Sequence, residues 1–253
     1  MEKRESALIV LTPAESKRLI ARAVASHPLV REAMRNGRVL VTNGTTNAYV
    51  GEELLGRSIS KYHYAAGYIA GGALRTTSSS ERLAPLAFWQ GKLVDTPMKD
   101  FLKDFGAEDV LIKGASAVDP LGHVGVLVAN DQGGTIGMAL GIVAARGCHL
   151  IVPVGLEKLI PSVERAAAQC GTLRFKHATG LACGLVPVVN AMVITEIQAL
   201  VMLGDVEATH VASGGIADCL GAVTLAVTGS SEAVDQTFAL VQGLKGEPPV
   251  SLP

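Results

Sequence analysis

Residues 110–141 read VLIKGASAVDPLGHVGVLVANDQGGTIGMALG and contain two short apolar runs, Val110–Ile112 and Val124–Val128. Each run ends in a polar, glycine-containing turn, and the second turn leads into a helical pattern of small residues. Buried strands that end in such turns are typical of parallel α/β sheets, which bind ligands at the carboxyl ends of their strands. The stretch therefore predicts an α/β fold with a ligand-binding edge.

The composition of the whole chain supports a large aliphatic core. Of the 253 residues, 49% are hydrophobic and only 4% are aromatic, as expected for strands buried on both faces. The 22 Lys and Arg residues nearly balance the 23 Asp and Glu residues without a basic cluster, so no nucleic acid partner is expected. No membrane partner is expected either, because Pro187 and Asn190 interrupt the most apolar window, residues 181–195.

The cysteines and the N-terminal residues favour a cytoplasmic protein. The four cysteines, Cys148, Cys170, Cys183 and Cys219, form no CxxC pair and show no spacing typical of a zinc site. The first residues, MEKRESALIVL, carry charges before an apolar run that is too short for a secretory leader. We therefore expect free thiols, no metal site and a cytoplasmic location.

Periodicity predicts the elements that precede the opening stretch. A capping-box spacing at Thr12–Glu15 begins a helix that reaches His27, and a short second helix covers residues 29–35. Residues 38–42 form a buried-strand pattern, and residues 48–55 follow as a helix. Residues 57–100 show little periodicity beyond a hairpin about Gly91, which leaves two alternatives, a functional lid or partner contact and a mobile surface insertion.

The second half of the chain predicts further alternation of helices and strands. Helices are expected at residues 137–146, 161–170, 195–203 and 230–244, and strands at residues 149–154, 185–189, 206–212 and 222–228. The C-terminal order is β-α-β-β-α, as in a ferredoxin-like small domain. We therefore expect an α/β ligand-binding domain over residues 1–180 and a small ferredoxin-like α/β domain over residues 181–253.

The turn at residues 43–47 is the first candidate site. Backbone N–H groups, the hydroxyls of Thr45 and Thr46, Asn47 and the positive end of a helix dipole would suit a phosphate or carboxylate. Gly44 would let the chain turn back without a clash at Cβ. Because Thr and Asn are also ordinary N-cap residues, a helix cap without a ligand is the alternative.

Gly133, Gly134 and Thr135 form a second candidate turn, which also follows a strand and opens a helix. The spacing GGxxG is not the GxGxxG of dinucleotide-binding loops, and no acidic residue stands at the usual distance. We therefore expect no nicotinamide or flavin cofactor. The turn is instead expected to bind a phosphate or pyrophosphate group of another ligand.

Polar side chains beside these turns complete the candidate site. Lys113 and Asp119 could clamp a ligand or move a proton if burial or their mutual interaction shifts their pKa values. The further candidates for substrate binding are Gly114, Ser116, Asn130, Asp131 and Lys158. For each of them, a solvated salt-bridging rim is the alternative.

Three segments together resemble the superfamily that contains ribose-5-phosphate isomerase, glucosamine-6-phosphate deaminase and the CoA transferases. Residues 12–17 and 41–46 are similar to the opening helix, strand and phosphate loop of the isomerase, and residues 113–119 to its DGADEVD segment. Residues 122–135 are similar to a run in the related methylthioribose-phosphate isomerase and initiation-factor regulatory subunits. The resemblance implies a mainly parallel Rossmann-like sheet, a ferredoxin-like small domain, a phosphorylated or CoA-linked ligand and a homo-oligomer.

The chain differs from this superfamily at the positions of the family's acidic residues. Of the acidic residues in DGADEVD only the last is kept, as Asp119, and Lys113, Ser116 and Ala117 replace the others. The proton-moving glutamate of the family falls on Gly141, so the base that an aldose–ketose isomerisation needs is missing. Two functions are therefore expected as alternatives, an enzyme that acts on a sugar phosphate or CoA ester at the Gly44 and Gly133 turns, and a non-catalytic ligand-sensing or regulatory protein of the same fold.

Overall fold

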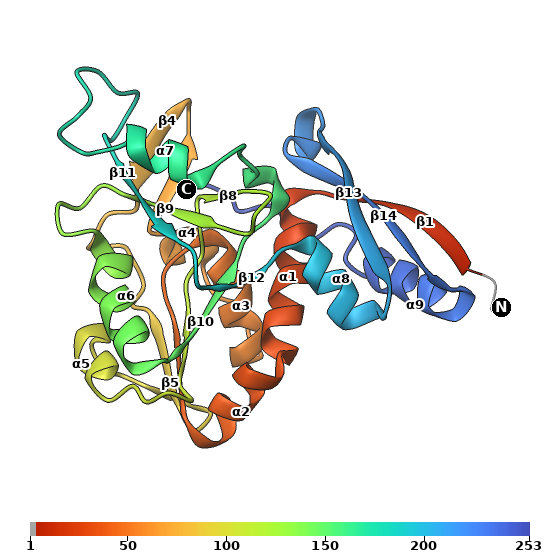
Figure 1. The fold of residues 1–253 in the computed structure, drawn as a ribbon, viewed down its shortest axis with the longest axis horizontal. Helices are drawn as coiled ribbons and strands as arrows, with labels where there is room; N and C mark the ends of the chain where they lie inside the picture. The colour runs from red at the N-terminus through yellow and green to blue at the C-terminus, as the bar shows by residue number, and fades with distance from the viewer. Residues whose placement is uncertain (1–3) are drawn as a thin grey trace.

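The computed structural model describes residues 4–253, which form an α/β protein around a mixed sheet of six strands (Figure 1). The strand order is β12 (Met192–Ile194), β10 (His149–Pro153), β7 (Val110–Ile112), β2 (Arg38–Val41), β5 (Leu86–Trp89) and β6 (Lys92–Val94). Strands β12, β10, β7 and β2 are parallel to one another, whereas β5 and β6 are added in antiparallel pairs. The expected α/β class is confirmed, and the two antiparallel strands make the sheet mixed.

Helices cover both faces of this sheet (Figure 1). One face packs against α1 (Pro13–Ser26), α2 (Pro28–Asn36) and α3 (Thr45–Leu55), and the other against α5 (Met98–Lys103) and α6 (Gly134–Arg146). Because side chains alternate along a strand, Val110 and Ile112 of β7 join the first core and Leu111 joins the second. All three are fully buried, and each contributes about 1.5–3 kcal/mol of burial free energy.

A separate antiparallel sheet lies beside this body and consists of β1 (Arg4–Leu11), β14 (Ala222–Ser230) and β13 (Glu207–Gly214). Helices α8 (Glu196–Gly204) and α9 (Ser231–Gln242) pack against it, and a short 3-10 turn, η2 (Ala217–Cys219), joins β13 to β14. We expected the strand at residues 185–189 in this sheet. It exists as β11 (Gly184–Val188), but it pairs with β9, and β1 from the other end of the chain pairs with β14. The division at residue 180 stays a prediction.

A third group of elements lies next to the carboxyl ends of the parallel strands. Strands β11, β9 (Val124–Val128) and β8 (Ala117–Val118) form a small sheet, flanked by α7 (Val163–Gln169). The 3-10 turn η1 (Leu156–Lys158), which follows β10, is linked to β8 because Ile160 N–H donates to the carbonyl of Val118 at 2.8 Å. The hairpin of β3 (Gly67–Ala70) and β4 (Ala73–Thr76) lies near the same end of the molecule (Figure 1).

Residues 57–100 differ from the expected long loop. They contain α4 (Lys61–Tyr64), the β3–β4 hairpin, strands β5 and β6 and the start of α5, so half of the segment is regular structure. The hairpin about Gly91 is confirmed, and Gly91 has a φ of 74°. Helices α3 and α6 begin earlier than expected, at Thr45 and Gly134, because a polar or glycine-rich first turn shows no apolar periodicity.

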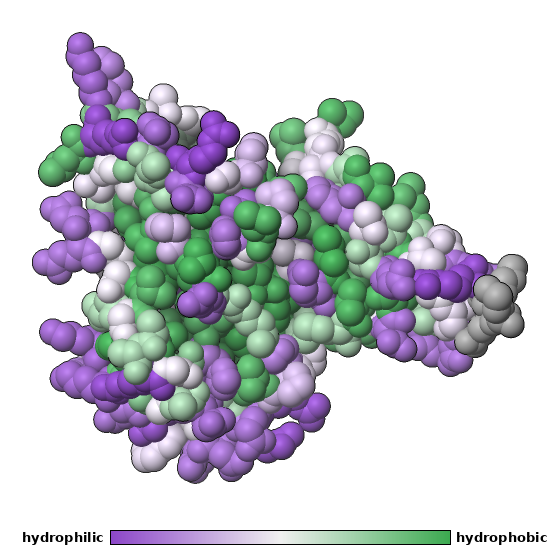
Figure 2. Space-filling view, viewed as in Figure 1, coloured by the Kyte–Doolittle hydropathy of each residue, from purple (hydrophilic) through white to green (hydrophobic). Residues whose placement is uncertain are grey.

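The surface is polar around its rim and apolar over the middle of the face drawn in Figure 2. Within residues 4–253, no helix has the length and apolar character needed to cross a membrane. The expectation that no secretory leader is present depends partly on residues 1–3, which lie outside the described residues.

Candidate functional site

The carboxyl ends of the four parallel strands bring several of the predicted residues together. We call this region the carboxyl edge and define it as residues 42–47, 113–116, 154–158 and 195–196, which follow β2, β7, β10 and β12 respectively. Because these strands are neighbours and parallel, the four segments lie side by side. Gly44, Thr45, Thr46, Asn47, Lys113, Gly114, Ser116 and Lys158 all belong to this edge.

The first turn of α3 leaves polar atoms inside the protein without partners. No side chain caps the helix, and Thr46 Oγ1 and Asn47 Oδ1 are buried with no hydrogen-bond partner among the described residues. The Asn47 amide nitrogen is engaged, because it donates to the carbonyls of Thr42 at 2.8 Å and Ile112 at 3.1 Å. A buried polar atom without a partner costs about 1–3 kcal/mol, so two of them at one helix N-terminus indicate a role beyond folding.

Gly44 has a different role from the one expected. Its φ of 161° is ordinary extended backbone, and an added Cβ would meet only Asn47 Cβ at 3.8 Å, so the turn does not need a glycine. Its N–H donates to the carbonyl of Tyr64 at 3.0 Å and is therefore not free for a ligand. The N–H groups of Thr45, Thr46 and Asn47 are the ones that helix geometry leaves without an intrahelical acceptor.

Lys113 and Lys158 bring two positive charges to the same turn. Lys113 Nζ donates to the carbonyl of Gly114 at 3.1 Å, and Lys158 Nζ donates to the next carbonyl, that of Ala115, at 3.0 Å. Burial and the charge of Lys158 lower the pKa of Lys113 to about 8, and burial also lowers the pKa of Lys158. Within residues 4–253, no carboxylate lies within 4.0 Å of either ammonium group.

Two glutamates at this edge add acid–base chemistry that sequence reasoning did not assign. Glu196 is fully buried, and its Oε2 accepts a hydrogen bond from Leu156 N–H at 2.9 Å. Glu157 Oε1 lies 3.2 Å from Lys17 Nζ. The remaining oxygen of Glu157, Oε2, is buried without a partner among the described residues, and the Ser16 hydroxyl lies close enough to the Glu196 carboxylate to lower its pKa. Burial and then the charge of Glu157 raise the pKa of Glu196 to about 7, so Glu196 can hold a proton near neutral pH.

Asp119 is placed as a structural carboxylate. Its Oδ1 accepts from the N–H groups of Leu121 and His123, both at 3.0 Å, and its Oδ2 accepts from Val163 N–H at 3.0 Å. Burial raises the pKa of Asp119, but the backbone N–H groups outweigh it and hold the pKa below its usual value. Asp119 Oδ2 also lies 3.5 Å from Nδ1 of His123. The carboxylate therefore fastens the turn before β9 to the start of α7 and lies beside an imidazole.

The second predicted turn lies at the start of α6. Asn130 Oδ1 accepts from Gln132 N–H at 2.9 Å and Gly134 N–H at 3.4 Å, and Gly133 has a φ of 77°, which favours glycine. Asn130 and Asp131 are exposed, whereas Thr135 is half-buried. No hydrogen bond between described residues joins this turn to the carboxyl edge. Ser116 is also exposed, and its Oγ accepts from Leu127 N–H at 3.2 Å.

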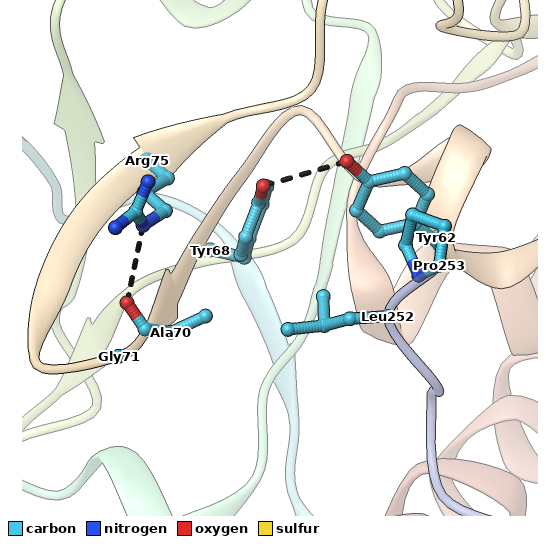
Figure 3. Close-up of a pocket in the computed structure, with 7 residues that line it drawn as sticks. All are labelled: Tyr62, Tyr68, Ala70, Gly71, Arg75, Leu252 and Pro253. Carbon is cyan, nitrogen blue, oxygen red and sulfur yellow. Dashed lines mark hydrogen bonds between the residues drawn. The ribbon is translucent and has the colours of Figure 1, made fainter.

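Two hollows lie away from these residues. The smaller, of about 300 Å³, is shown in Figure 3 and is lined by Tyr62, Tyr68, Ala70, Gly71, Arg75, Leu252 and Pro253. In it the hydroxyls of Tyr62 and Tyr68 lie 3.5 Å apart, and Arg75 Nε donates to the carbonyl of Ala70 at 3.2 Å. The larger, of about 520 Å³, is lined by Leu74, Leu127, Cys170, Phe175, His177, Ala178, Thr179, Leu181, Ala182 and Cys183. Neither hollow is lined by a residue of the carboxyl edge.

The described residues contain no group of three or more His, Cys, Asp or Glu side chains arranged to hold a metal ion. Comparison of the chain with protein-family models, curated proteins and solved structures gave no match. The resemblance to the isomerase and CoA transferase superfamily therefore stays a prediction.

Proposed function

We propose that this protein binds and acts on a small anionic metabolite, a sugar phosphate or a CoA ester, at the carboxyl edge. The observation that carries the proposal is the pair of ammonium groups of Lys113 and Lys158, which have no carboxylate within 4.0 Å among residues 4–253. They belong to the same edge as the start of α3, where Thr46 Oγ1 and Asn47 Oδ1 are unpartnered. A helix N-terminus and nearby lysines together favour a negative charge.

In this proposal the residues have separate tasks. The N–H groups of Thr45–Asn47 and the Thr46 hydroxyl hold the anion, and Lys158 balances its charge. Glu196 holds or moves a proton, a task for which a carboxyl with a pKa of about 7 is suited. The Gly133 turn, at the N-terminus of a 13-residue helix, stays a second predicted anion site.

The proposal extends to the finer fold and the assembly. We propose that the sheet is Rossmann-like, with four parallel strands as support, and that the antiparallel sheet with α8 and α9 is a ferredoxin-like small domain. We propose a homo-oligomer on the basis of the proposed relationship to the isomerase and CoA transferase superfamily, and a cytoplasmic location on the basis of the cysteine pattern.

A non-catalytic sensor is the second candidate. It is favoured by the engagement of Asp119 with three backbone N–H groups, which gives that carboxylate a structural task. The buried Glu196 favours the enzyme, because burial without a full set of partners costs stability that a pure binding protein has no reason to retain.

The test is the thermal stability of the full chain with ribose 5-phosphate, acetyl-CoA and inorganic phosphate. A ligand at about one hundred times its dissociation constant adds about 2.7 kcal/mol, which raises the Tm by about 5–10 °C for a chain of this size. No shift with any of the three would overturn the proposal. Conversion of the bound compound, followed by mass spectrometry, separates an enzyme from a sensor.

Thr46→Val is the matched variant for this test. It keeps the shape of the side chain and removes a buried hydroxyl that has no partner in the described protein, so the unfolding free energy should rise by about 1–3 kcal/mol. The ligand-induced shift should shrink. Thr237→Val is the control, because the Thr237 hydroxyl donates to the carbonyl of Gly204 and its loss should lower stability without changing the ligand-induced shift.

A further inference from the structure

We propose that Lys113 is a nucleophilic amine that forms an imine with an aldehyde or ketone whose anionic group is bound at the carboxyl edge. The inference rests on the proposed function, because the bound anion brings the carbonyl carbon to the amine. It adds the substrate class, namely carbonyl compounds that carry a phosphate or a carboxylate.

The position of Lys113 fits this role. It directly follows β7, which lies between β10 and β2 in the parallel part of the sheet, and its own N–H is held by the carbonyl of Ile151 at 3.0 Å. Its side chain is half-buried, and its Nζ donates to a single backbone carbonyl, that of Gly114. A lysine that served only to balance charge in the core would face a carboxylate, and Lys113 has none within 4.0 Å among residues 4–253.

The surroundings of Lys113 favour its neutral, nucleophilic form. Burial and the nearby ammonium of Lys158 lower the pKa of Lys113 to about 8, as expected for a lysine that is desolvated beside another cation. About one-tenth of such an amine is neutral at pH 7, which is about 200 times the neutral fraction of an exposed lysine.

Asn47 brings an unpartnered acceptor next to the segment that carries Lys113. An ideal Cβ at Gly114, the residue after Lys113, would lie in van der Waals contact with Asn47 Oδ1 at 3.5 Å, so this buried acceptor, which has no hydrogen-bond partner among the described residues, lies beside the backbone of Gly114. The carbinolamine that forms first carries a hydroxyl, which can donate a hydrogen bond to such an acceptor.

The step is balanced with water as the second product. The neutral amine nitrogen of Lys113 attacks the carbonyl carbon, and the carbonyl oxygen takes up a proton to give a carbinolamine. Transfer of a proton to the hydroxyl and loss of water then leave a C=N bond that carries one positive charge. The ammonium of Lys158, on the neighbouring carbonyl, is the acid next to this site.

Reductive trapping tests the proposal directly. The full-length protein is mixed with pyridoxal 5′-phosphate, an aldehyde that carries a phosphate, below one equivalent, and sodium borohydride then supplies hydride to the C=N bond. Mapping of the peptides by mass spectrometry should place at least ten times more adduct on Lys113 than on the exposed Lys92, and Lys113→Arg should remove this adduct. An even distribution over the lysines, or an adduct mainly on Lys158, would overturn the assignment.

A second measurement separates failure of the imine from failure of the anion site. Lys113→Arg keeps the positive charge, so it should retain the thermal shift with inorganic phosphate, and phosphate should also reduce trapping in the wild type. If phosphate shifts the Tm and Lys113 is not trapped, the imine is overturned and the anion site stands. If ribose 5-phosphate, acetyl-CoA and inorganic phosphate all give no shift and Lys113 is not trapped, both proposals fall.

Discussion

Lys113 and Glu196 are ionisable residues whose burial, and then a neighbouring like charge, disfavours their charged forms. Lys113 faces Lys158 rather than a carboxylate, and Glu196 lies buried near Glu157. Each arrangement costs stability, because the folded state holds the group against its preferred charge. Such costs are typical of functional sites, where activity is favoured over stability.

Lys113→Met should therefore stabilise the protein near neutral pH. The folded-state pKa of about 8 lies below the unfolded value, so between these values the unfolded chain binds more protons and wild-type stability rises with pH. Because the side chain is half-buried, we expect a gain of about 1–2 kcal/mol at pH 7, and the gain should fade between about pH 8 and pH 10. Urea unfolding measures it, and Lys92→Met, at an exposed position, should change stability by less than about 0.5 kcal/mol. A loss of stability at pH 7 would contradict this view of Lys113.

Glu196→Gln should change the pH dependence in the opposite sense. The folded-state pKa of about 7 lies above the unfolded value, so the folded state binds more protons and wild-type stability falls as the pH rises from about 4.5 through 7. Gln keeps the shape and stays neutral, so the variant should gain up to about 3 kcal/mol on the wild type at pH 8 and little at pH 5. Urea unfolding at both pH values measures this difference.

Glu52→Gln is the control for this prediction. Glu52 is paired with Arg18 and Lys61, and although burial raises its pKa, these partners hold the pKa below the usual value. Its loss should destabilise the protein throughout this pH range. A Glu196→Gln effect that is equal at pH 5 and pH 8 would show that Glu196 is ionised at both pH values.

How well the site residues could be predicted depended on the strand that precedes them. Lys113 follows the strongly apolar VLI of β7, and Asn47 lies in the first turn of the helix after RVLV of β2, so the sequence pattern predicted that both residues follow strands. Glu196 was missed because it follows β12, which has three residues and was not expected. The backbone contacts of Asp119 could not be predicted, because one of its partners, Val163 N–H, is 44 residues away in the sequence.

Among the elements, β1 shows that the local sequence pattern does not predict which strand it pairs with or which of its side chains are buried. Its run ALIVL is continuously apolar, yet Ile9 and Leu11 are buried while Leu8 and Val10 are exposed. The alternation comes from its pairing with β14, in which Leu11 lies opposite Val223 at the other end of the chain. Such a distant pairing leaves no periodic signal in either segment.

The antiparallel strands β5 and β6 illustrate the same limit. The hairpin turn about Gly91 was recognisable because glycine marks such turns, and this prediction is confirmed. The pairing of β5 with β2, in which Arg38 lies opposite Trp89, was not predicted, because it depends on the packing of a segment with little periodicity.

At the scale of the whole molecule, the parallel part of the sheet determines where chemistry can occur. The sequence predicted strands β2, β7 and β10 and the turns that follow them, and the structure places these turns at one edge. The expected homo-oligomer stays a prediction. Exposed apolar side chains at β12 and α8, among them Met192 and Val201, contribute to the apolar surface of the molecule.

The most direct test of the anion site at the carboxyl edge is a titration of the ¹⁵N-labelled protein with ribose 5-phosphate, followed by amide chemical shifts. We expect the largest changes at the N–H groups of Thr45, Thr46 and Asn47, with a further change at Gly114, and weaker changes in Thr46→Val. Changes confined to Gly133–Thr135, or no saturable change at any amide, would contradict the proposed site.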